Sequence, residues 1–96
     1  MKKLVLVLML LGVVIDGDTL SLGGERWRLA NVDAPEMDTV EGQEAKKFMV
    51  GLVAGKDVRC RFLYRDKYGR SVGQCFVGSK SLGVELVMSG HGRIWE

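Results

Sequence analysis

The sequence predicts an α+β fold built mainly from strands, and three observations support this prediction. Short apolar segments are separated by glycine-containing turns, as is typical of strands, and a single stretch over residues 41–55 carries a strong helical period. The chain has 96 residues, which suits one domain with a small core. Its 47% hydrophobic and 27% charged side chains are ordinary for a globular protein, so disorder is not expected.

The first strands are expected between residues 13 and 33. The segment DTLSLGGERWRLANV predicts two strands joined at Gly23-Gly24, because this dipeptide accepts the positive φ of a tight hairpin turn. The second strand should stop at DAPE, since Pro35 cannot donate a ladder hydrogen bond and forces Ala34 into an extended conformation.

One amphipathic helix follows, starting between Glu41 and Gln43 and ending at Gly55. Its apolar residues recur at i, i+3, i+4 and i+7: Ala45, Phe48, Met49 and Leu52. Gly51 lies inside this helix, where glycine costs about 1 kcal/mol relative to alanine. Close packing on a sheet is the expected reason for it.

The second half of the chain predicts another hairpin and a short helix. DVRCRFLYRDKYGRSVGQCFVG predicts two strands around a turn at DKYGR, and Leu82 to Ser89 predicts a helix that ends at Gly90. A helix between the third and fourth of five strands is the order of the oligonucleotide/oligosaccharide-binding (OB) barrel. A plain meander with one packed helix is the alternative, and we favour the barrel.

The start of the chain has two interpretations. Lys2 and Lys3 precede an unbroken apolar run from Leu4 to Leu11, which is the order of an export signal. Even extended to Ile15, the run is shorter than the ~18 residues that a spanning helix needs, and no A-x-A-like cleavage site follows it. Residues 1–12 are thus a signal peptide or uncleaved anchor, or else the start of the first strand, with one domain over residues 13–96. We favour export (secreted, periplasmic or membrane-anchored) over a cytoplasmic location.

Two features of the second hairpin leave alternatives open. Cys60 and Cys75 are symmetric about the turn, so they form a disulfide in an oxidising compartment or are two small core residues. They lack the spacing and the adjacent histidine of a zinc site. Six basic residues against two acids between Lys56 and Arg70 give a local charge of +4, in a chain of net charge +2. This cluster is either a polyanion-facing patch or a solvated strand surface.

Five motifs, taken in order and at their spacing, resemble the staphylococcal nuclease (thermonuclease) family: VIDGDT, RLANVDAPE, GQEAKKF, DKYGR and LGVELVMSG. The resemblance extends from Val13 to Gly92. It implies a calcium-dependent endonuclease on an OB-fold barrel, which cleaves DNA and RNA with little sequence preference and leaves 3′-phosphates. It also implies a monomer without a stable protein partner. The alternative is an inactive OB-fold module that binds nucleic acid or protein.

The resemblance also implies a metal site. Asp18 and Asp33 match carboxylate ligands of Ca²⁺, and the backbone carbonyl of Ala34 matches a third oxygen ligand. Calcium prefers such hard oxygen donors, with water completing the shell. The two acids around Gly17 then have different roles, and Asp16 is expected to order the turn.

The remaining matched residues act on the phosphate. Glu36 matches the base that activates the attacking water. Arg28 and Arg70 match two arginines that grip the scissile phosphate, where a planar guanidinium can bind two oxygens at once. Lys67 and Tyr68 match residues that bind a neighbouring phosphate.

Two other residues are interpreted without reference to the family, and a third by comparison with it. Arg26 represents an ordinary surface arginine, and His91 is interpreted as a solvent or packing residue. Better-known family members continue beyond the last helix with tyrosines that stack on a base. Trp95 is the aromatic residue that this chain offers there.

Overall fold

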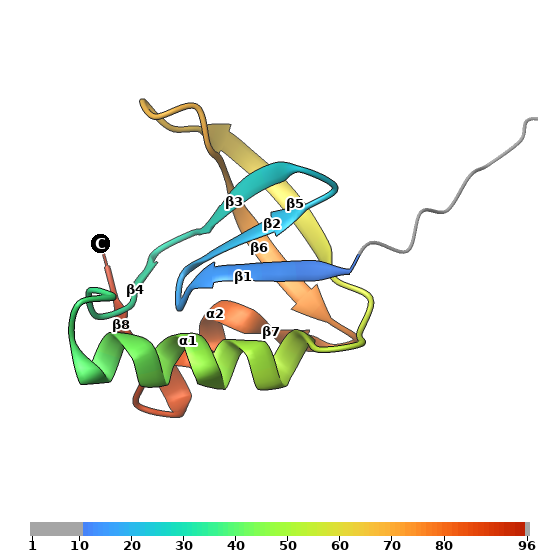
Figure 1. Cartoon of the computed structure of the whole chain (residues 1–96). Coiled ribbons are helices and arrows are strands. Elements are labelled where there is room, and N and C mark those ends of the chain that lie inside the picture. Colours follow the sequence, from blue (N-terminus) through green and yellow to red (C-terminus); the bar gives the residue numbers. More distant parts are fainter. Residues whose placement is uncertain (1–10, 96) are drawn as a thin grey trace, which may run out of the picture.

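The computed structural model describes residues 11–95, and Figure 1 shows its elements. In chain order they are β1 (Gly12–Asp16), β2 (Thr19–Leu22), β3 (Glu25–Leu29), β4 (Val32–Asp33), α1 (Val40–Val53), β5 (Arg59–Arg65), β6 (Ser71–Val77), β7 (Lys80–Ser81), α2 (Leu82–Met88) and β8 (Arg93–Ile94). The predicted α+β fold, mainly strands with two helices, is confirmed.

The main sheet has the strand order β1-β2-β3-β6-β5, and β7 pairs with β6. Only β3 and β6 run parallel among these pairs of described strands. Both predicted hairpins are present, and Gly23 and Gly24 turn the first one with φ values of 55° and 83°. A separate antiparallel pair joins β4 to β8, which brings the end of the chain against the segment that precedes α1.

The closed barrel is not found in residues 11–95. Strands β1 and β5 are the two ends of the sheet, and the isolated bridge Leu11↔Asp57 is the pairing recorded between their neighbouring residues. A ladder of several residue pairs would be needed to close the barrel there. The described part of the chain therefore forms an open, strongly bent sheet, with α1 running beneath β1 (Figure 1).

Helix α1 begins at Val40, just before the predicted start, because Thr39 caps it. The Thr39 hydroxyl accepts a hydrogen bond from the Gly42 amide at 3.0 Å. After Val53 the chain turns at Gly55, whose φ is 68°. Ala45 and Met49 are fully buried, whereas Phe48 and Leu52 pack on the edge of the core.

Gly51 does not pack against the sheet. It is exposed, and a Cβ added to it would meet nothing within 4 Å. The closely packed glycine of α1 is Gly42, where a Cβ would overlap the Glu36 carbonyl and lie 2.9 Å from that of Pro35. Both glycines fall within the helical pattern, and only the tertiary contact distinguishes them.

The core lies between the sheet and the two helices. Its most buried large side chains come from β2, β3, α1 and α2: Leu20, Leu29, Met49, Leu82 and Leu86. Cys75 is buried among them and forms a disulfide with Cys60, with a sulfur–sulfur distance of 2.03 Å. These two residues are directly opposite each other in the β5–β6 ladder, so the sequence alternative is resolved in favour of the disulfide.

The leader or anchor expected at the start of the chain falls almost entirely on residues 1–10, outside the described residues. No helix within residues 11–95 has the length and apolar character needed to cross a bilayer.

Gly42→Ala tests whether α1 is held against the loop that carries Glu36. The added methyl group would overlap the loop, and such overpacking destabilises a fold by about 3 kcal/mol at the upper end of the usual range. This cost is larger than the roughly 1 kcal/mol by which alanine stabilises a helix relative to glycine. We therefore expect the free energy of unfolding to fall by about 2 kcal/mol, measured by urea denaturation.

Gly51→Ala is the matched control in the same helix. It should raise the free energy of unfolding by about 1 kcal/mol, because the added methyl group meets only solvent. Equal effects of the two substitutions would contradict the close contact at Gly42.

Candidate active site

One polar cavity collects the predicted catalytic and metal-binding residues. It has a volume of about 270 Å³ and is lined by Asp16, Asp18, Arg28, Asp33, Ala34, Pro35, Glu36, Met37 and Arg70. We call it the central cavity. All six residues predicted for catalysis or metal binding therefore lie around one space, although they come from the β1–β2 turn, β3, β4, the loop before α1 and the turn before β6.

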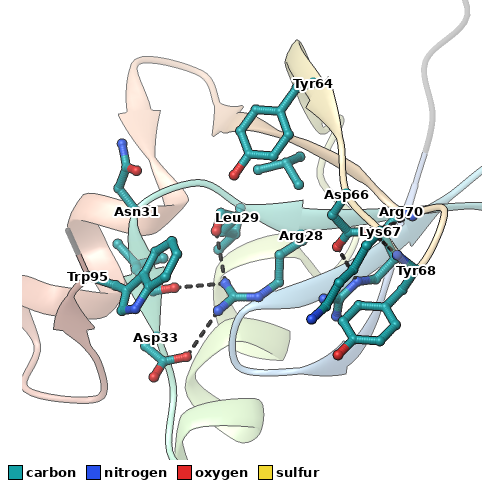
Figure 2. Close-up of a pocket in the computed structure, with 12 residues that line it drawn as sticks. Arg28, Leu29, Asn31, Asp33, Tyr64, Asp66, Lys67, Tyr68, Arg70 and Trp95 are labelled. Atoms are coloured by element: carbon teal, nitrogen blue, oxygen red, sulfur yellow. Dashed lines mark hydrogen bonds and ion pairs between the residues drawn. The ribbon is translucent and has the colours of Figure 1, made fainter.

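Lys67 and Tyr68 line a neighbouring cavity of about 420 Å³, called here the hairpin cavity. It shares Arg28, Asp33 and Arg70 with the central cavity. Its side chains are drawn in Figure 2, with Tyr64, Lys67 and Tyr68 supplied by the β5–β6 hairpin and Trp95 by the end of the chain. The residues expected to bind a neighbouring phosphate are thus adjacent to the central cavity but outside it.

The turn between β1 and β2 separates the roles of its two acids. The Asp18 amide donates to Asp16 Oδ1 at 3.2 Å, so Asp16 orders the turn as expected. Gly17 lets this turn pack on α1, because a Cβ there would lie 2.7 Å from the Ala34 Cβ and 2.9 Å from that of Ala45. The turn is therefore fixed against both the loop and the helix.

Asp18 is buried and fully engaged. Its carboxylate accepts hydrogen bonds from the Thr19 hydroxyl at 3.1 Å and from the Ala34 amide at 2.8 Å. Burial raises the pKa of this carboxyl, as does its contact with Asp16, and these effects outweigh the Ala34 hydrogen bond and the Arg28 charge, which lower it. A cation close to Asp18 would favour its charged form.

Arg28 is the cation that occupies this position in the structure. Its Nη2 donates to Asp33 Oδ1 at 3.0 Å and lies 3.4 Å from Asp18 Oδ2. Its Nη1 donates to the backbone carbonyls of Leu29, at 2.8 Å, and Val32, at 2.7 Å. Figure 2 shows the side chain extending from β3 toward Asp33. Arg28 therefore binds the two predicted metal ligands as well as facing the central cavity.

The donor set fits a hard divalent cation. The Asp18 and Asp33 carboxylates converge on one cationic nitrogen, and carboxylate oxygens are the ligands that Ca²⁺ and Mg²⁺ prefer. Within residues 11–95, no three His, Cys, Asp or Glu side chains are grouped as a metal site. A cation held here would therefore need neutral oxygens besides the two carboxylates. The backbone of Ala34 lies at the cavity, because the Ala34 amide donates a hydrogen bond to Asp18.

Glu36 is exposed at the mouth of the central cavity. Its backbone is held, because its carbonyl accepts hydrogen bonds from the Thr39 hydroxyl at 2.6 Å and the Thr39 amide at 3.1 Å. Its carboxylate makes no hydrogen bond or ion pair with the residues that the structure describes. Glu36 thus combines a fixed backbone with a free carboxylate.

Arg70 is positioned by Asp66, which the sequence analysis did not identify. Arg70 Nε donates to Asp66 Oδ2 at 2.8 Å, and the amides of Arg70 and Tyr68 donate to Asp66 Oδ1 at 2.9 and 3.0 Å. The Tyr68 ring lies 5.3 Å from both the Lys67 ammonium and the Arg70 guanidinium carbon. The i, i+4 spacing of an aspartate and an arginine around a glycine turn was the available sequence signal.

Two further residues reach the cavities through long-range pairing. Trp95 lines the hairpin cavity, and Arg93 Nη2 lies 3.6 Å from Asp33 Oδ2. Both depend on the β4–β8 pair, which joins segments about 60 residues apart and has no local sequence signal.

Asp66→Asn tests the charge that holds Arg70. Burial raises the pKa of the Asp66 carboxyl, but hydrogen bonds from Arg70 and Tyr68 outweigh this and lower it below the ordinary 3.8. The ionised Asp66 carboxylate therefore stabilises the folded state fully above pH 3.8, and this stabilisation is lost as the pH falls through the lowered pKa of Asp66. We expect the melting temperature of Asp66→Asn to fall below that of the parent at pH 7, and the difference to shrink below pH 3.8.

Asp38→Asn is the control, since it removes an exposed carboxylate that accepts no hydrogen bond from Arg70. A difference between Asp66→Asn and the parent that is the same at pH 3 and pH 7 would show that the negative charge of Asp66 contributes nothing.

Comparisons with known proteins show the family of the chain. A family model described as "Staphylococcal nuclease homologue" matches residues 26–96. The chain is 40% identical over 90 residues to the succinoglycan biosynthesis protein ExoI of Rhizobium meliloti (strain 1021), covering 81% of this chain and 47% of that protein. It is 38% identical over 86 residues to an uncharacterized endonuclease of Escherichia coli O157:H7, covering 85% of this chain and 56% of that protein. A probable staphylococcal-like nuclease of rice, CAN3, is 30% identical over 66 residues, covering 69% of this chain and 18% of that protein.

The chain thus spans about half the length of the first two relatives. The family match covers most of the chain, including Arg28, Asp33, Glu36 and Arg70. The chain therefore belongs to the staphylococcal nuclease homologue family.

Proposed function

We propose that this protein is a calcium-dependent endonuclease that hydrolyses phosphodiester bonds of DNA and RNA with little sequence preference. The observation that carries the proposal is the central cavity. Two arginines, the two carboxylates predicted to bind the metal, and a glutamate without a hydrogen-bond partner in residues 11–95 all line this one space. Relatives named as endonucleases support the reaction class. A module that only bound nucleic acid would have no use for the free Glu36 carboxylate beside the converging Asp18 and Asp33.

Arg70 and Arg28 bind the scissile phosphate in this proposal. A phosphodiester under attack by water gathers negative charge on its equatorial oxygens, and fixed guanidinium donors stabilise that charge. Asp66 holds Arg70 through Nε, which leaves the two terminal nitrogens available to hydrogen-bond a phosphate. Lys67 and Tyr68, in the hairpin cavity, bind the next phosphate of the same strand.

Glu36 accepts the proton of the attacking water. Because its backbone is fixed by Thr39 and its carboxylate has no partner among residues 11–95, it can hold a water without first breaking another contact. Attack opposite the leaving 5′-oxygen then yields a 3′-phosphate, as the family resemblance implies.

Asp18 and Asp33 hold the calcium ion, with the Ala34 carbonyl as a third ligand. When bound, the ion adds positive charge next to the phosphate. The two carboxylates are already brought together around Arg28 Nη2, so an ion bound by both would share or take over the contacts of that nitrogen.

We also propose that residues 13–96 act as this one domain, that it works as a monomer and that the protein is exported. The Cys60–Cys75 disulfide supports export, because disulfides persist in oxidising compartments. The charged and then apolar start of the sequence agrees with it.

Glu36→Gln tests the general base. It removes the proton acceptor but keeps the size of the side chain, so we expect kcat on single-stranded DNA to fall about 10²–10⁴-fold with an unchanged melting temperature. Arg70→Lys keeps the charge but loses the two-pronged donor, and we expect a fall in kcat of about 10²-fold.

The control for both variants is Arg26→Gln, an exposed arginine on β3 that lines neither cavity. Cleavage by Glu36→Gln at the parental rate would overturn the assigned role. Binding of the oligonucleotide without any cleavage by the parent, with calcium or magnesium, would favour the inactive binding module.

Calcium binding is tested separately by thermal unfolding. At a calcium concentration about 100 times Kd, a ligand that binds only the folded state stabilises it by about 2.7 kcal/mol, so the melting temperature should rise and a chelator should reverse the rise. Asp18→Asn and Asp33→Asn should lose this response, whereas the exposed Asp38→Asn should keep it. No calcium-dependent shift in the parent would refute the metal site without bearing on phosphate binding.

A further inference from the structure

A third cavity opens on the other side of the central cavity from Lys67 and Tyr68. It has a volume of about 380 Å³ and is formed by residues 33–36 and 90–93, and we call it the C-terminal cavity. It shares Asp33, Ala34, Pro35 and Glu36 with the central cavity. With the hairpin cavity it shares only Asp33, so the three cavities form a series with the central one in the middle.

The short strand β8 connects the two outer cavities. Its Arg93 is directly opposite Asp33 in the ladder with β4, and the Trp95 amide donates to the Asn31 carbonyl at 2.8 Å. Arg93 lines the C-terminal cavity, and Trp95 lines the hairpin cavity. One short segment, β8 and the residue after it, therefore lines both outer cavities.

Arg93 has the charge and the freedom to bind a phosphate. Its side chain is 81% exposed, and its single ion pair within residues 11–95 is the long contact of 3.6 Å with Asp33. Asp33 is also bound by Arg28 at 3.0 Å, so it keeps a cationic partner when Arg93 turns to a ligand. The cavity otherwise carries the negative charges of Asp33 and Glu36, which would repel a polyanion unless a cation offset them.

His91 gives this cavity an aromatic surface. Its ring packs against Phe48 of α1 with centroids 4.7 Å apart and an angle of 30° between the planes, which holds it in place. A held aromatic ring beside a cationic side chain is the combination that binds single-stranded nucleic acid, since bases stack on rings and phosphates pair with cations.

We propose that the C-terminal cavity is a nucleotide-binding subsite on the far side of the scissile phosphate from Lys67 and Tyr68. Arg93 binds the phosphate of that nucleotide, and the His91 ring contacts its base. This inference rests on the proposed nuclease function for the position of the scissile phosphate. It extends that function, because it predicts that the substrate is gripped on both sides of the cleaved bond.

The test uses a set of single-stranded DNA oligonucleotides built on one dinucleotide. One series is extended by single nucleotides on the 5′ side and the other on the 3′ side. Cleavage is measured in the presence of calcium. Binding of fluorescently labelled oligonucleotides is measured by anisotropy in the presence of a chelator, which prevents cleavage. Each extension should lower the KM and Kd of the parent protein, because each adds a phosphate contact.

Arg93→Gln and Lys67→Gln form a matched pair of variants. For Arg93→Gln we expect extension on one side only to stop lowering KM, so that KM on those substrates is about tenfold above that of the parent. For Lys67→Gln we expect the same effect on the opposite side. For both variants we expect the smallest loss on the dinucleotide, because it lacks the added phosphates. Arg93→Lys should retain most of the gain, and Arg26→Gln, which lines none of the three cavities, should behave as the parent.

The outcomes separate this inference from the proposed function. An equal loss on every substrate would mean that Arg93 acts only by holding Asp33, and that result overturns the subsite. Loss on the same side for Arg93→Gln and Lys67→Gln, or no loss for Arg93→Gln, overturns it as well. If the variants lose binding on one side each, and neither they nor the parent cleaves the oligonucleotides, the subsite is supported and the hydrolytic function is rejected. A parent that neither binds nor cleaves the oligonucleotides rejects both.

Discussion

The arrangement of the site depends on the guanidinium of Arg28. It connects the turn before β2, through Asp18, with β4, through Asp33 and the Val32 carbonyl. Asp18 and Arg28 expose only 11% and 19% of their side chains, so neither charge is well solvated without the other. Removing one partner of a buried pair typically costs about 3–5 kcal/mol. Loss of Arg28 would therefore disturb the fold and the chemistry together.

The two arginines of the central cavity consequently have unequal freedom. Arg28 commits Nη1 to two carbonyls and Nη2 to Asp33, whereas Arg70 commits Nε to Asp66. Within the described residues, the terminal nitrogens of Arg70 make no hydrogen bond or ion pair, and its side chain is 28% exposed. Arg70 can thus bind a phosphate without giving up a hydrogen bond, whereas Arg28 can do so only while it shares its donors with the carbonyls and carboxylates that it already contacts.

The local parts of this structure follow from the sequence, and the long-range parts do not. The Gly23-Gly24 hairpin, the turn at DKYGR and α1 are encoded by residues close together in the chain, and all three were predicted. The β4–β8 pair, the exposure of Gly51 and the close contact at Gly42 depend on segments far apart. The candidate site residues were proposed because motif spacing matched a family, whereas the contacts of Arg28, Asp66 and Arg93 could be seen only in three-dimensional geometry.

The two acids of the VIDGDT motif illustrate how such geometry resolves an electrostatic conflict. Asp16 faces the turn and accepts the Asp18 amide, so part of its charge is taken up by the backbone. Asp18 is buried, and its raised pKa shows that Arg28 and the Ala34 amide do not fully compensate for lost solvation. A folded protein keeps such an uncompensated carboxylate only where surrounding contacts enforce it, here through Gly17 packed on Ala34 and Ala45. More positive charge brought to Asp18 would relieve the residual cost, and the calcium ion proposed above would supply such charge.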